Sequence, residues 1–284
     1  MIETENVFTL LKSAERFLDS KGVPDAKASA ETLLAFVLKT KRSKLALIRE
    51  QKLSENEVSL FKEYLLRRAQ REPAAYITGF CGFMGFEFKV NENVLIPRPE
   101  TELLIEEVLA AKLQAAKQQN AILDLCAGSG CIAISLAKLG NFKSITAADI
   151  SPEALNVAKE NAKLLGASEI KFVESDLFQN LSGYKFDIII SNPPYVSENE
   201  YLKLEPELTF EPKIALTTQD NGLFFYKKIS IEAPKHLNPG GMIFLELNAN
   251  KAFETEKIFK DAGFKNIKII NDYSNLPRVL KANL

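Results

Sequence analysis

Short apolar stretches alternate with helical patterns through the second part of this 284-residue chain, and this alternation limits the possible folds more than any other feature. The apolar stretches lie at Ala121–Leu125, Ser144–Ala148, Ile170–Val173, Phe186–Ile190 and Met242–Leu247. Helical patterns lie at Cys131–Leu139, Pro152–Leu165, Gly222–His236 and Ala252–Ala262, and the strand-like pair Ile267–Ile270 and Arg278–Ala282 closes the chain. The alternation predicts an α/β fold, in which a parallel sheet carries helices on both faces.

The first part of the chain shows helical periodicity instead. The patterns predict helices over 7–18, Ala28–Leu38, Ser43–Arg49 and Ser54–Gln70. Ser54, with Glu57 three residues later, is the expected N-cap of the last of these. The aromatic, glycine-punctuated stretch Gly79–Val90 predicts a β-hairpin, and a helix is expected over 100–117. We therefore expect a helical domain at 1–72, a hairpin linker at 73–97 and a larger domain at 98–284.

Composition narrows the class of protein. A net charge of −1 disfavours a protein that binds duplex nucleic acid without a partner protein, because such proteins are normally basic. Three cysteines and one histidine, without metal-ligand spacing, predict no disulfide framework and no metal site. The acidic start of the chain is unlike a signal peptide, and no apolar run has the length of a membrane span, so a cytoplasmic location is expected. The basic residues Lys39, Lys41, Arg42 and Lys44 are either a solvated helix end or a contact for an acidic or RNA-bearing partner.

A nucleotide-type pocket is predicted where the first strands end. The stretch Ile122–Gly130 runs from a strand into a glycine turn that opens a helix, where free N–H groups face a ligand. Asp149 and Asp176 end the next two strands and offer carboxylates to a ribose and to an adenine amino group, while Leu177 covers the ring. The turn also fits Gly-x-Gly-x-x-Ala through Ala133, so a dinucleotide dehydrogenase is an alternative.

The segment Ser191-Asn192-Pro193-Pro194-Tyr195 follows the apolar strand Phe186–Ile190. The Asn192 side chain and the Pro193 backbone offer two carbonyl oxygens in directions that the prolines largely fix, and Tyr195 adds a flat ring. Two acceptors beside a ring suit a planar –NH2 group. An enzyme that methylates such a nitrogen needs a site of this kind, with two carbonyl acceptors beside a ring, whereas a dehydrogenase does not.

These motifs resemble those of the class I S-adenosylmethionine methyltransferases, and most closely those of the PrmC/HemK family, the N5-glutamine methyltransferases of peptide chain release factors. The resemblance covers nearly the whole chain. It rests on Ile96–Glu102, Asp124–Ala133, Asp149–Leu155, Ser175–Phe178, Ser191–Tyr195 and Phe210–Pro212. It implies a Rossmann-like, mostly parallel seven-stranded sheet with an N-terminal helical domain that recognises the release factor.

The resemblance also implies site roles. It places the methionine part of S-adenosylmethionine against Cys126, Ala127, Gly128, Ser129 and Gly130, with Asp124 supporting the loop. It assigns the ribose to Asp149 and the adenine to Asp176 and Leu177, with Asn192 also beside the cofactor. The glutamine amide would bind Asn192, Pro193, Pro194 and Tyr195, of which Asn192, Pro193 and Tyr195 are the expected catalytic residues. The implied reaction modifies a GGQ-type loop and modulates translation termination, and the expected enzyme is a monomer that needs neither membrane nor nucleic acid.

Some residues depart from the family pattern or stay open. Cys126-Ala127 replaces a Gly-Thr pair, so we expect a negative φ at Cys126. Leucine at 177 stands where an aromatic residue is common. Arg98 either contacts a ligand or pairs with Glu100 or Glu102, Glu246 either lines the pocket or is structural, and His236 is expected to cap a helix or lie on the surface. An adenine-N6 or other nucleic-acid amino methyltransferase is the main alternative, and a non-catalytic S-adenosylmethionine-binding module is another.

Overall fold

The computed structural model describes residues 6–114 and 120–284, and its chain divides into two compact units. The first unit holds residues 1–80 together with Glu205–Phe210, and the second holds Cys81–Leu204 and Glu211–Leu284. The expected helix over 100–117 is α5 (Pro99–Gln114), and its last three expected residues lie outside the described part of the chain.

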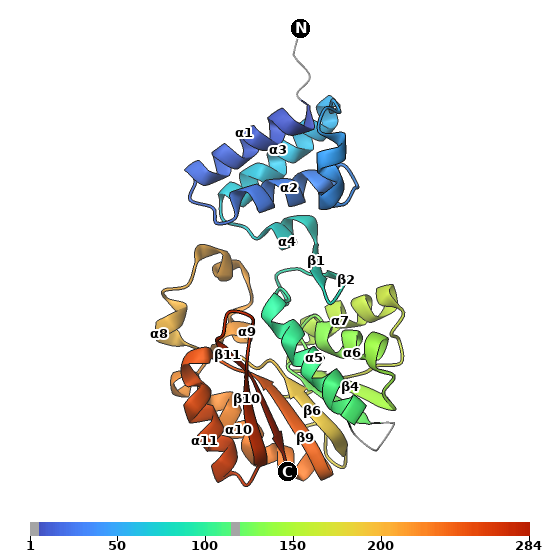
Figure 1. The fold of residues 1–284 in the computed structure, drawn as a ribbon, viewed down its shortest axis with the longest axis vertical. Coiled ribbons are helices and arrows are strands. Elements are labelled where there is room, and N and C mark those ends of the chain that lie inside the picture. Colours follow the sequence, from blue (N-terminus) through green and yellow to red (C-terminus); the bar gives the residue numbers. More distant parts are fainter. Residues whose placement is uncertain (1–5, 115–119) are drawn as a thin grey trace. The chain divides into compact units, whose positions relative to one another are not determined.

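The first unit is helical (Figure 1). It contains α1 (Val7–Ser20), α2 (Ala26–Val37), a 3₁₀ helix at Arg42–Ile48, α3 (Glu55–Ala69) and α4 (Ala74–Thr78). Ser54 and Glu57 form the predicted capping box at the start of α3. The core of the unit is built from apolar side chains of α1, α2 and α3, among them Leu18, Leu33 and Phe61.

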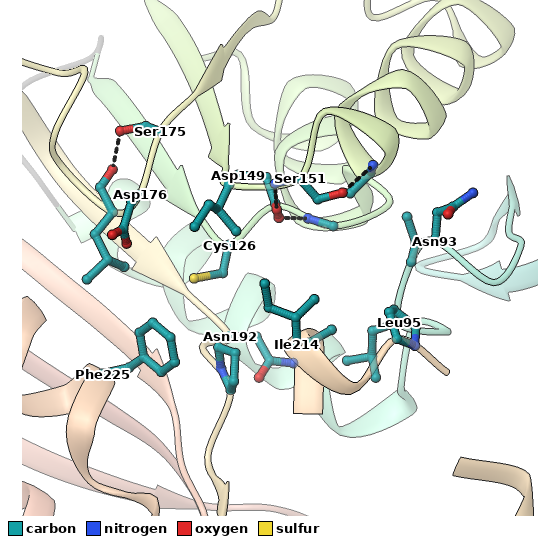
Figure 2. Close-up of a pocket in the computed structure, with 18 residues that line it drawn as sticks. Asn93, Leu95, Cys126, Asp149, Ser151, Ser175, Asp176, Asn192, Ile214 and Phe225 are labelled. Carbon is teal, nitrogen blue, oxygen red and sulfur yellow. Dashed lines mark hydrogen bonds between the residues drawn. The ribbon is translucent and has the colours of Figure 1, made fainter. Parts of the chain in front are cut away.

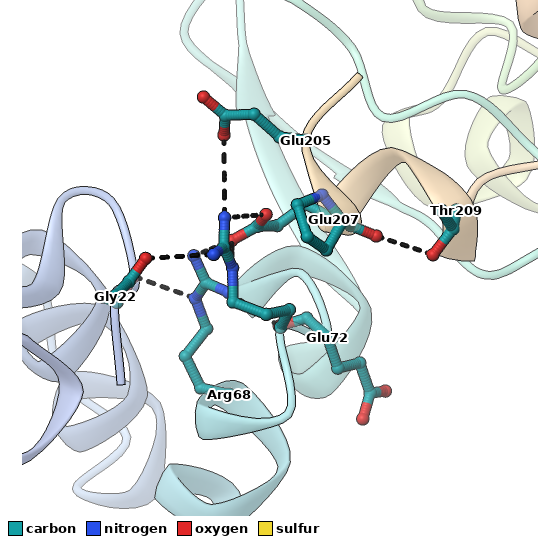
Figure 3. Close-up of polar contacts among 9 residues, drawn as sticks. Gly22, Arg68, Glu72, Glu205, Glu207 and Thr209 are labelled. Atoms are coloured by element: carbon teal, nitrogen blue, oxygen red, sulfur yellow. Dashed lines mark hydrogen bonds and ion pairs between the residues drawn. The ribbon is translucent and has the colours of Figure 1, made fainter. Parts of the chain in front are cut away.

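A short segment from far along the chain completes this unit. It contains the 3₁₀ helix Pro206–Phe210, and Glu207 is its anchor (Figure 3). Arg71 donates to both carboxylate oxygens of Glu207 at 2.6 and 2.5 Å, and Arg68 donates to Oε1 at 2.8 Å. Burial alone would raise the pKa of Glu207, but the hydrogen bonds from Arg71 and Arg68 hold it below its usual value.

The Glu207 anchor predicts a stability effect. The Glu207→Ala variant leaves the buried Arg68 without its carboxylate partner, so the free energy of unfolding of the helical unit should fall by about 3 kcal/mol. Glu205→Ala is the matched control, because Glu205 lies 3.9 Å from Arg71 and is 65% exposed. That control should change the same quantity by less than about 0.5 kcal/mol. Urea unfolding followed by circular dichroism measures both, and equal effects would contradict the assignment.

The same anchor predicts a dependence on pH. A carboxyl group with a lowered folded pKa stabilises the fold above its unfolded pKa of about 4.3, and that stabilisation disappears as the pH falls through the folded value. The difference between wild type and Glu207→Ala should therefore be full at pH 7 and shrink below about pH 4. A difference that grows on acidification would contradict the lowered pKa.

The second unit is built around a seven-stranded sheet, as expected (Figure 1). The strand order is β10-β11-β9-β6-β3-β4-β5. Only β11 runs antiparallel to its neighbours, since the other paired strands within the sheet are parallel. The bounds are β3 (Ala121–Leu125), β4 (Ser144–Asp149), β5 (Lys171–Glu174), β6 (Phe186–Ser191), β9 (Leu237–Glu246), β10 (Lys265–Asn271) and β11 (Pro277–Asn283). The predicted α/β architecture is therefore confirmed.

Helices cover both faces of the sheet. Side chains of α5, α6 (Cys131–Gly140) and α7 (Pro152–Leu165) share one buried cluster with Ile122 of β3. Those of α10 (Phe224–His236) and α11 (Ala252–Asp261) share another with Leu123. Neighbouring residues of a strand point to opposite faces, so buried strands carry apolar residues at consecutive positions. Because β3, β4 and β6 are parallel, their carboxyl ends lie along the same edge of the sheet, and the site lies at this edge.

The expected hairpin is formed by β1 (Phe80–Phe83) and β2 (Phe86–Lys89). Other short elements carry no sequence pattern that predicts them: β7 (Val196–Ser197), α8 (Glu198–Tyr201), α9 (Lys213–Leu216) and β8 (Thr217–Thr218). The expected helix at Ser43–Arg49 is a 3₁₀ helix rather than an α-helix. Within residues 6–114 and 120–284, no helix combines the length and apolarity needed to cross a bilayer.

Candidate active site

A cavity opens at the carboxyl edge of the sheet in the second unit (Figure 2). Its wall includes polar and apolar side chains from the ends of β3, β4, β5 and β6. Seven of the predicted site residues lie on this wall: Cys126, Gly128, Asp149, Asp176, Leu177, Asn192 and Pro194. The fold therefore brings together predicted site residues that lie up to 68 positions apart in the sequence, from Cys126 to Pro194.

The glycine turn after β3 adopts a left-handed conformation at three alternate positions. The φ angles are 60° at Cys126, 53° at Gly128 and 77° at Gly130. The expectation of a negative φ at Cys126 is therefore wrong. The Ala127 N–H donates to the carbonyl of Ala148 at 3.1 Å, and this bond to the end of β4 holds the turn against a conformational cost of about 1–2 kcal/mol.

The two glycines of this turn have different reasons to be glycine. A Cβ on Gly130 would lie 3.0 Å from the Cβ of Ala158, so this position allows α6 and α7 to approach closely. A Cβ on Gly128 would meet no atom within 4 Å, and Gly128 lies on the cavity wall. The bare backbone at Gly128 is therefore open to a ligand.

Five predicted residues do not line the cavity. Ala127 and Ser129 are buried within the turn, Gly130 is the N-cap residue of α6, and Pro193 and Tyr195 are also absent from the wall. Cys131 is buried, as expected for a core residue. Any contact of Ala127 or Ser129 with a ligand must therefore involve the backbone.

Two carboxylates organise the turn. Asp124 is buried in β3 and accepts a hydrogen bond from the Ala133 N–H at 3.1 Å, which ties the strand to the first turn of α6. Burial raises the pKa of Asp124 well above its usual value. Asp149 accepts from the Gly128 N–H at 2.8 Å and from the Ser151 N–H at 2.9 Å. Burial raises the pKa of Asp149, and these two backbone bonds oppose the rise.

The turn after β5 presents Asp176 and Leu177 to the cavity. Leu177 has a φ of 49°, and the Ser175 hydroxyl donates to its carbonyl at 2.8 Å. The same hydroxyl oxygen accepts from the Asn180 N–H at 3.0 Å. Ser175, which the sequence analysis did not single out as a site residue, therefore holds the turn that carries the predicted adenine-contacting pair.

Asn192 and Tyr195 are held by a buried network behind the cavity. The Asn192 side-chain amide donates to Thr101 Oγ1 at 3.3 Å, and the Thr101 hydroxyl donates to Glu246 Oε2 at 2.6 Å. The Tyr195 hydroxyl donates to Glu246 Oε1 at 3.1 Å. Burial raises the pKa of Glu246, and the hydrogen bonds from Thr101 and Tyr195 oppose the rise. Burial and the Glu246 charge raise the pKa of the Tyr195 phenol, so it stays protonated.

Arg98 pairs with neither Glu100 nor Glu102. Its guanidinium bonds to Glu211, a carboxylate that is 4% exposed and also accepts from the Ile96 N–H at 3.0 Å. Glu102 instead accepts from the Met84 N–H at 2.6 Å. The Arg98–Glu211 pair fixes the start of a segment whose next residues, Pro212, Ile214 and Ala215, lie on the cavity wall.

The remaining wall residues were not predicted. They are Asn93, Val94, Leu95, Ile150, Ser151, Ala154, Ser175, Pro212, Ile214, Ala215 and Phe225. Ile150 and Ser151 directly follow Asp149, so their position at a strand end was the available signal. Phe225 lies in the first turn of α10 and has no such signal. His236 is buried and stacks on Phe178 with ring centroids 4.7 Å apart, so the expectation of a surface position is wrong.

The wall offers the chemistry that a nucleoside bearing an amino-acid chain requires. Carboxylates at Asp149 and Asp176 can accept from hydroxyl and amino groups, and the open backbone at Gly128 admits a close approach. Apolar side chains of Leu177, Ile150 and Ile214 can cover a ring. The residues present therefore fit S-adenosylmethionine.

Comparisons with known proteins also indicate an enzyme that uses S-adenosylmethionine. Residues 101–222 match the methyltransferase small domain family, and residues 9–79 match the PrmC N-terminal domain family. A methyltransferase from Pyrococcus furiosus has a similar fold, with a TM-score of 0.53 and 19% identity over 70% of this chain and 89% of that one. The hMettl16 catalytic domain is also similar in fold, with a TM-score of 0.55 and 16% identity over 81% of this chain and 82% of that one. The fold and site define a class I S-adenosylmethionine-dependent methyltransferase.

The sequence relatives specify the family. The release factor glutamine methyltransferase of Chlorobaculum tepidum is 40% identical, covering 97% of this chain and 96% of its own. The release factor glutamine methyltransferase of Leptospira interrogans is also 40% identical, over 98% of this chain and 98% of the relative. This chain belongs to the release factor glutamine methyltransferase family, and it is an S-adenosylmethionine-dependent glutamine methyltransferase. The predicted PrmC/HemK resemblance is confirmed.

Proposed function

We propose that this enzyme transfers a methyl group from S-adenosylmethionine to the side-chain amide nitrogen, N5, of a glutamine in the GGQ-type loop of peptide chain release factors, and thereby modulates translation termination. The observation that carries the proposal is the place of Asn192. It lies on the same cavity wall as Gly128 and Asp149, in a chain that matches release factor glutamine methyltransferases over almost its full length.

The residues of the chain bind and orient the amide. An amide nitrogen is a poor nucleophile because its lone pair is delocalised into the carbonyl. The Asn192 side-chain oxygen and the Pro193 carbonyl accept its two N–H groups, which raises the electron density on nitrogen and stabilises the positive charge that grows there. S-adenosylmethionine supplies, when bound, a methyl group on a sulfonium sulfur. Methyl transfer would leave S-adenosylhomocysteine, the alkylated nitrogen would lose one proton to water, and no metal is required by this scheme.

The other residues keep their predicted roles in the proposal. Cys126, Ala127, Gly128, Ser129 and Gly130 bind the methionine part of the cofactor. Asp149 binds the ribose, and Asp176 with Leu177 binds the adenine. Pro194 and Tyr195 complete the glutamine site. We also propose that the helical domain at 1–72 recognises the release factor, that residues 73–97 link it to the catalytic domain at 98–284, and that the enzyme acts in the cytoplasm as a monomer.

A transfer assay tests the proposal against its main alternative. Tritiated S-adenosylmethionine and purified enzyme are incubated with release factors in one arm and with double- and single-stranded DNA in another. The proposal predicts label in the release factor at a single glutamine, and no label when that glutamine is replaced by alanine. Label in DNA adenine instead would establish the nucleic-acid amino methyltransferase.

A further inference from the structure

Glu246 and Thr101 stand behind the proposed amide site without reaching the cavity. Glu246 is the last residue of β9 and is 1% exposed, and Thr101 lies in the first turn of α5 and is 2% exposed. Neither side chain lies on the cavity wall. The two residues nevertheless connect to Asn192 and Tyr195 through an unbroken series of hydrogen bonds.

The chemistry of these groups sets the direction of each bond. The Thr101 hydroxyl has a single proton and donates it to Glu246 Oε2 at 2.6 Å. The Thr101 oxygen can then only accept, and the group that faces it at 3.3 Å must be the NH2 half of the Asn192 amide. The carbonyl half of Asn192 is thereby turned away from Thr101.

The same carboxylate also holds the ring of Tyr195. Its second oxygen accepts from the Tyr195 hydroxyl at 3.1 Å, so one buried group connects the two ends of the Asn-Pro-Pro-Tyr segment. The Tyr195 carbonyl oxygen also accepts from the Asn248 side-chain amide at 3.4 Å. The backbone of Gly222 packs closely against the same oxygen, since a Cβ on Gly222 would lie 2.8 Å from it. The segment therefore has little freedom to rotate.

We propose that Glu246 and Thr101 are positioning residues that set the orientation of the Asn192 amide, so that its carbonyl oxygen, and not its NH2 group, faces the substrate. This proposal rests on the proposed function of Asn192. On this proposal, the network makes the site select a glutamine side chain over a glutamate. A site of two acceptors binds an NH2 donor and repels a carboxylate, which can only accept.

The test compares four variants in the full-length enzyme. Thr101→Val keeps the shape and removes the hydroxyl, Thr101→Ser restores it, and Glu246→Gln replaces the acceptor-only group with one that also donates. The matched control is Thr255→Val in α11, where an equally buried hydroxyl donates to the Lys251 carbonyl at 2.8 Å. Thr101→Val and Glu246→Gln should lower kcat about 100-fold, with KM for the release factor and Kd for S-adenosylmethionine changed less than about threefold. Thr101→Ser should recover most of the rate, and Thr255→Val should keep it.

A binding measurement gives a readout that does not depend on turnover. Calorimetry compares a release-factor domain carrying the natural glutamine with its Gln→Glu variant. The wild-type enzyme should prefer glutamine, and Thr101→Val should reduce that preference at least about tenfold, because Asn192 is then free to present its NH2 group.

Unchanged kcat and unchanged preference in Thr101→Val, failure of Thr101→Ser to rescue, or an equal loss in Thr255→Val would each overturn the positioning role. A wild-type enzyme that methylates no release factor would instead overturn the proposed function, so the two failures are distinguishable.

Discussion

Replacing Asn192 with alanine should lower kcat for release-factor methylation about 1,000-fold while Kd for S-adenosylmethionine stays within about twofold. The variant loses the side-chain oxygen that we propose accepts one amide N–H and stabilises the charge developing on nitrogen, and loss of one such preorganised dipole costs about 10²–10³ in rate. Cofactor affinity should be retained because the proposed cofactor contacts, Gly128, Asp149 and Asp176, stay on the cavity wall. Single-turnover transfer of a tritiated methyl group measures the rate, and calorimetry measures the affinity.

The matched control is Asn271→Ala, an exposed asparagine at the end of β10 whose side-chain amide bonds only to Asn275 among the contacts described. This variant should keep the full rate. If Asn192→Ala turned over as fast as the control, the two-acceptor amide site would have no place in the mechanism.

Replacing Asp149 with alanine should have its largest effect on the cofactor. The proposed hydrogen bonds from both ribose hydroxyls are lost, and Gly128 and Ser151 also lose the acceptor of their N–H groups. A hydrogen bond to a charged group contributes about 1.5–3 kcal/mol, so Kd for S-adenosylmethionine should rise about 100-fold. Kcat at saturating cofactor should fall much less.

Two further variants sharpen this result. Asp149→Asn keeps one acceptor oxygen and should lose about tenfold in affinity. Asp261→Ala removes an exposed carboxylate at the end of α11 and should lose none. Normal affinity in a folded Asp149→Ala variant would refute the ribose assignment.

Local sequence signals predicted much of the fold because they act within a few residues. Ser151 accepts from the Ala154 N–H at 3.0 Å and caps α7, which begins with Pro152 as the pattern indicates. Consecutive apolar residues marked the buried strands, and the end of each strand placed Asp149, Asp176 and Asn192 at one edge. The site was therefore predictable wherever a strand end determined it.

Long-range contacts account for what the sequence analysis missed. Arg98 bonds to Glu211, 113 positions away, whereas sequence proximity pointed to Glu100 and Glu102. The elements between Val196 and Gly222 are two to five residues long and carry no periodicity, and one of them is anchored through Glu207. The positive φ of Cys126 depends on the bond between Ala127 and Ala148, which no local rule anticipates.

The most direct test is a crystal structure of the enzyme with S-adenosylhomocysteine and a release-factor domain. The glutamine amide nitrogen should lie about 2.7–3.2 Å from both the Asn192 side-chain oxygen and the Pro193 carbonyl oxygen, and face the sulfur. A glutamine nitrogen bound elsewhere in the cavity, or an Asn192 that presents its NH2 group to the substrate, would contradict the account.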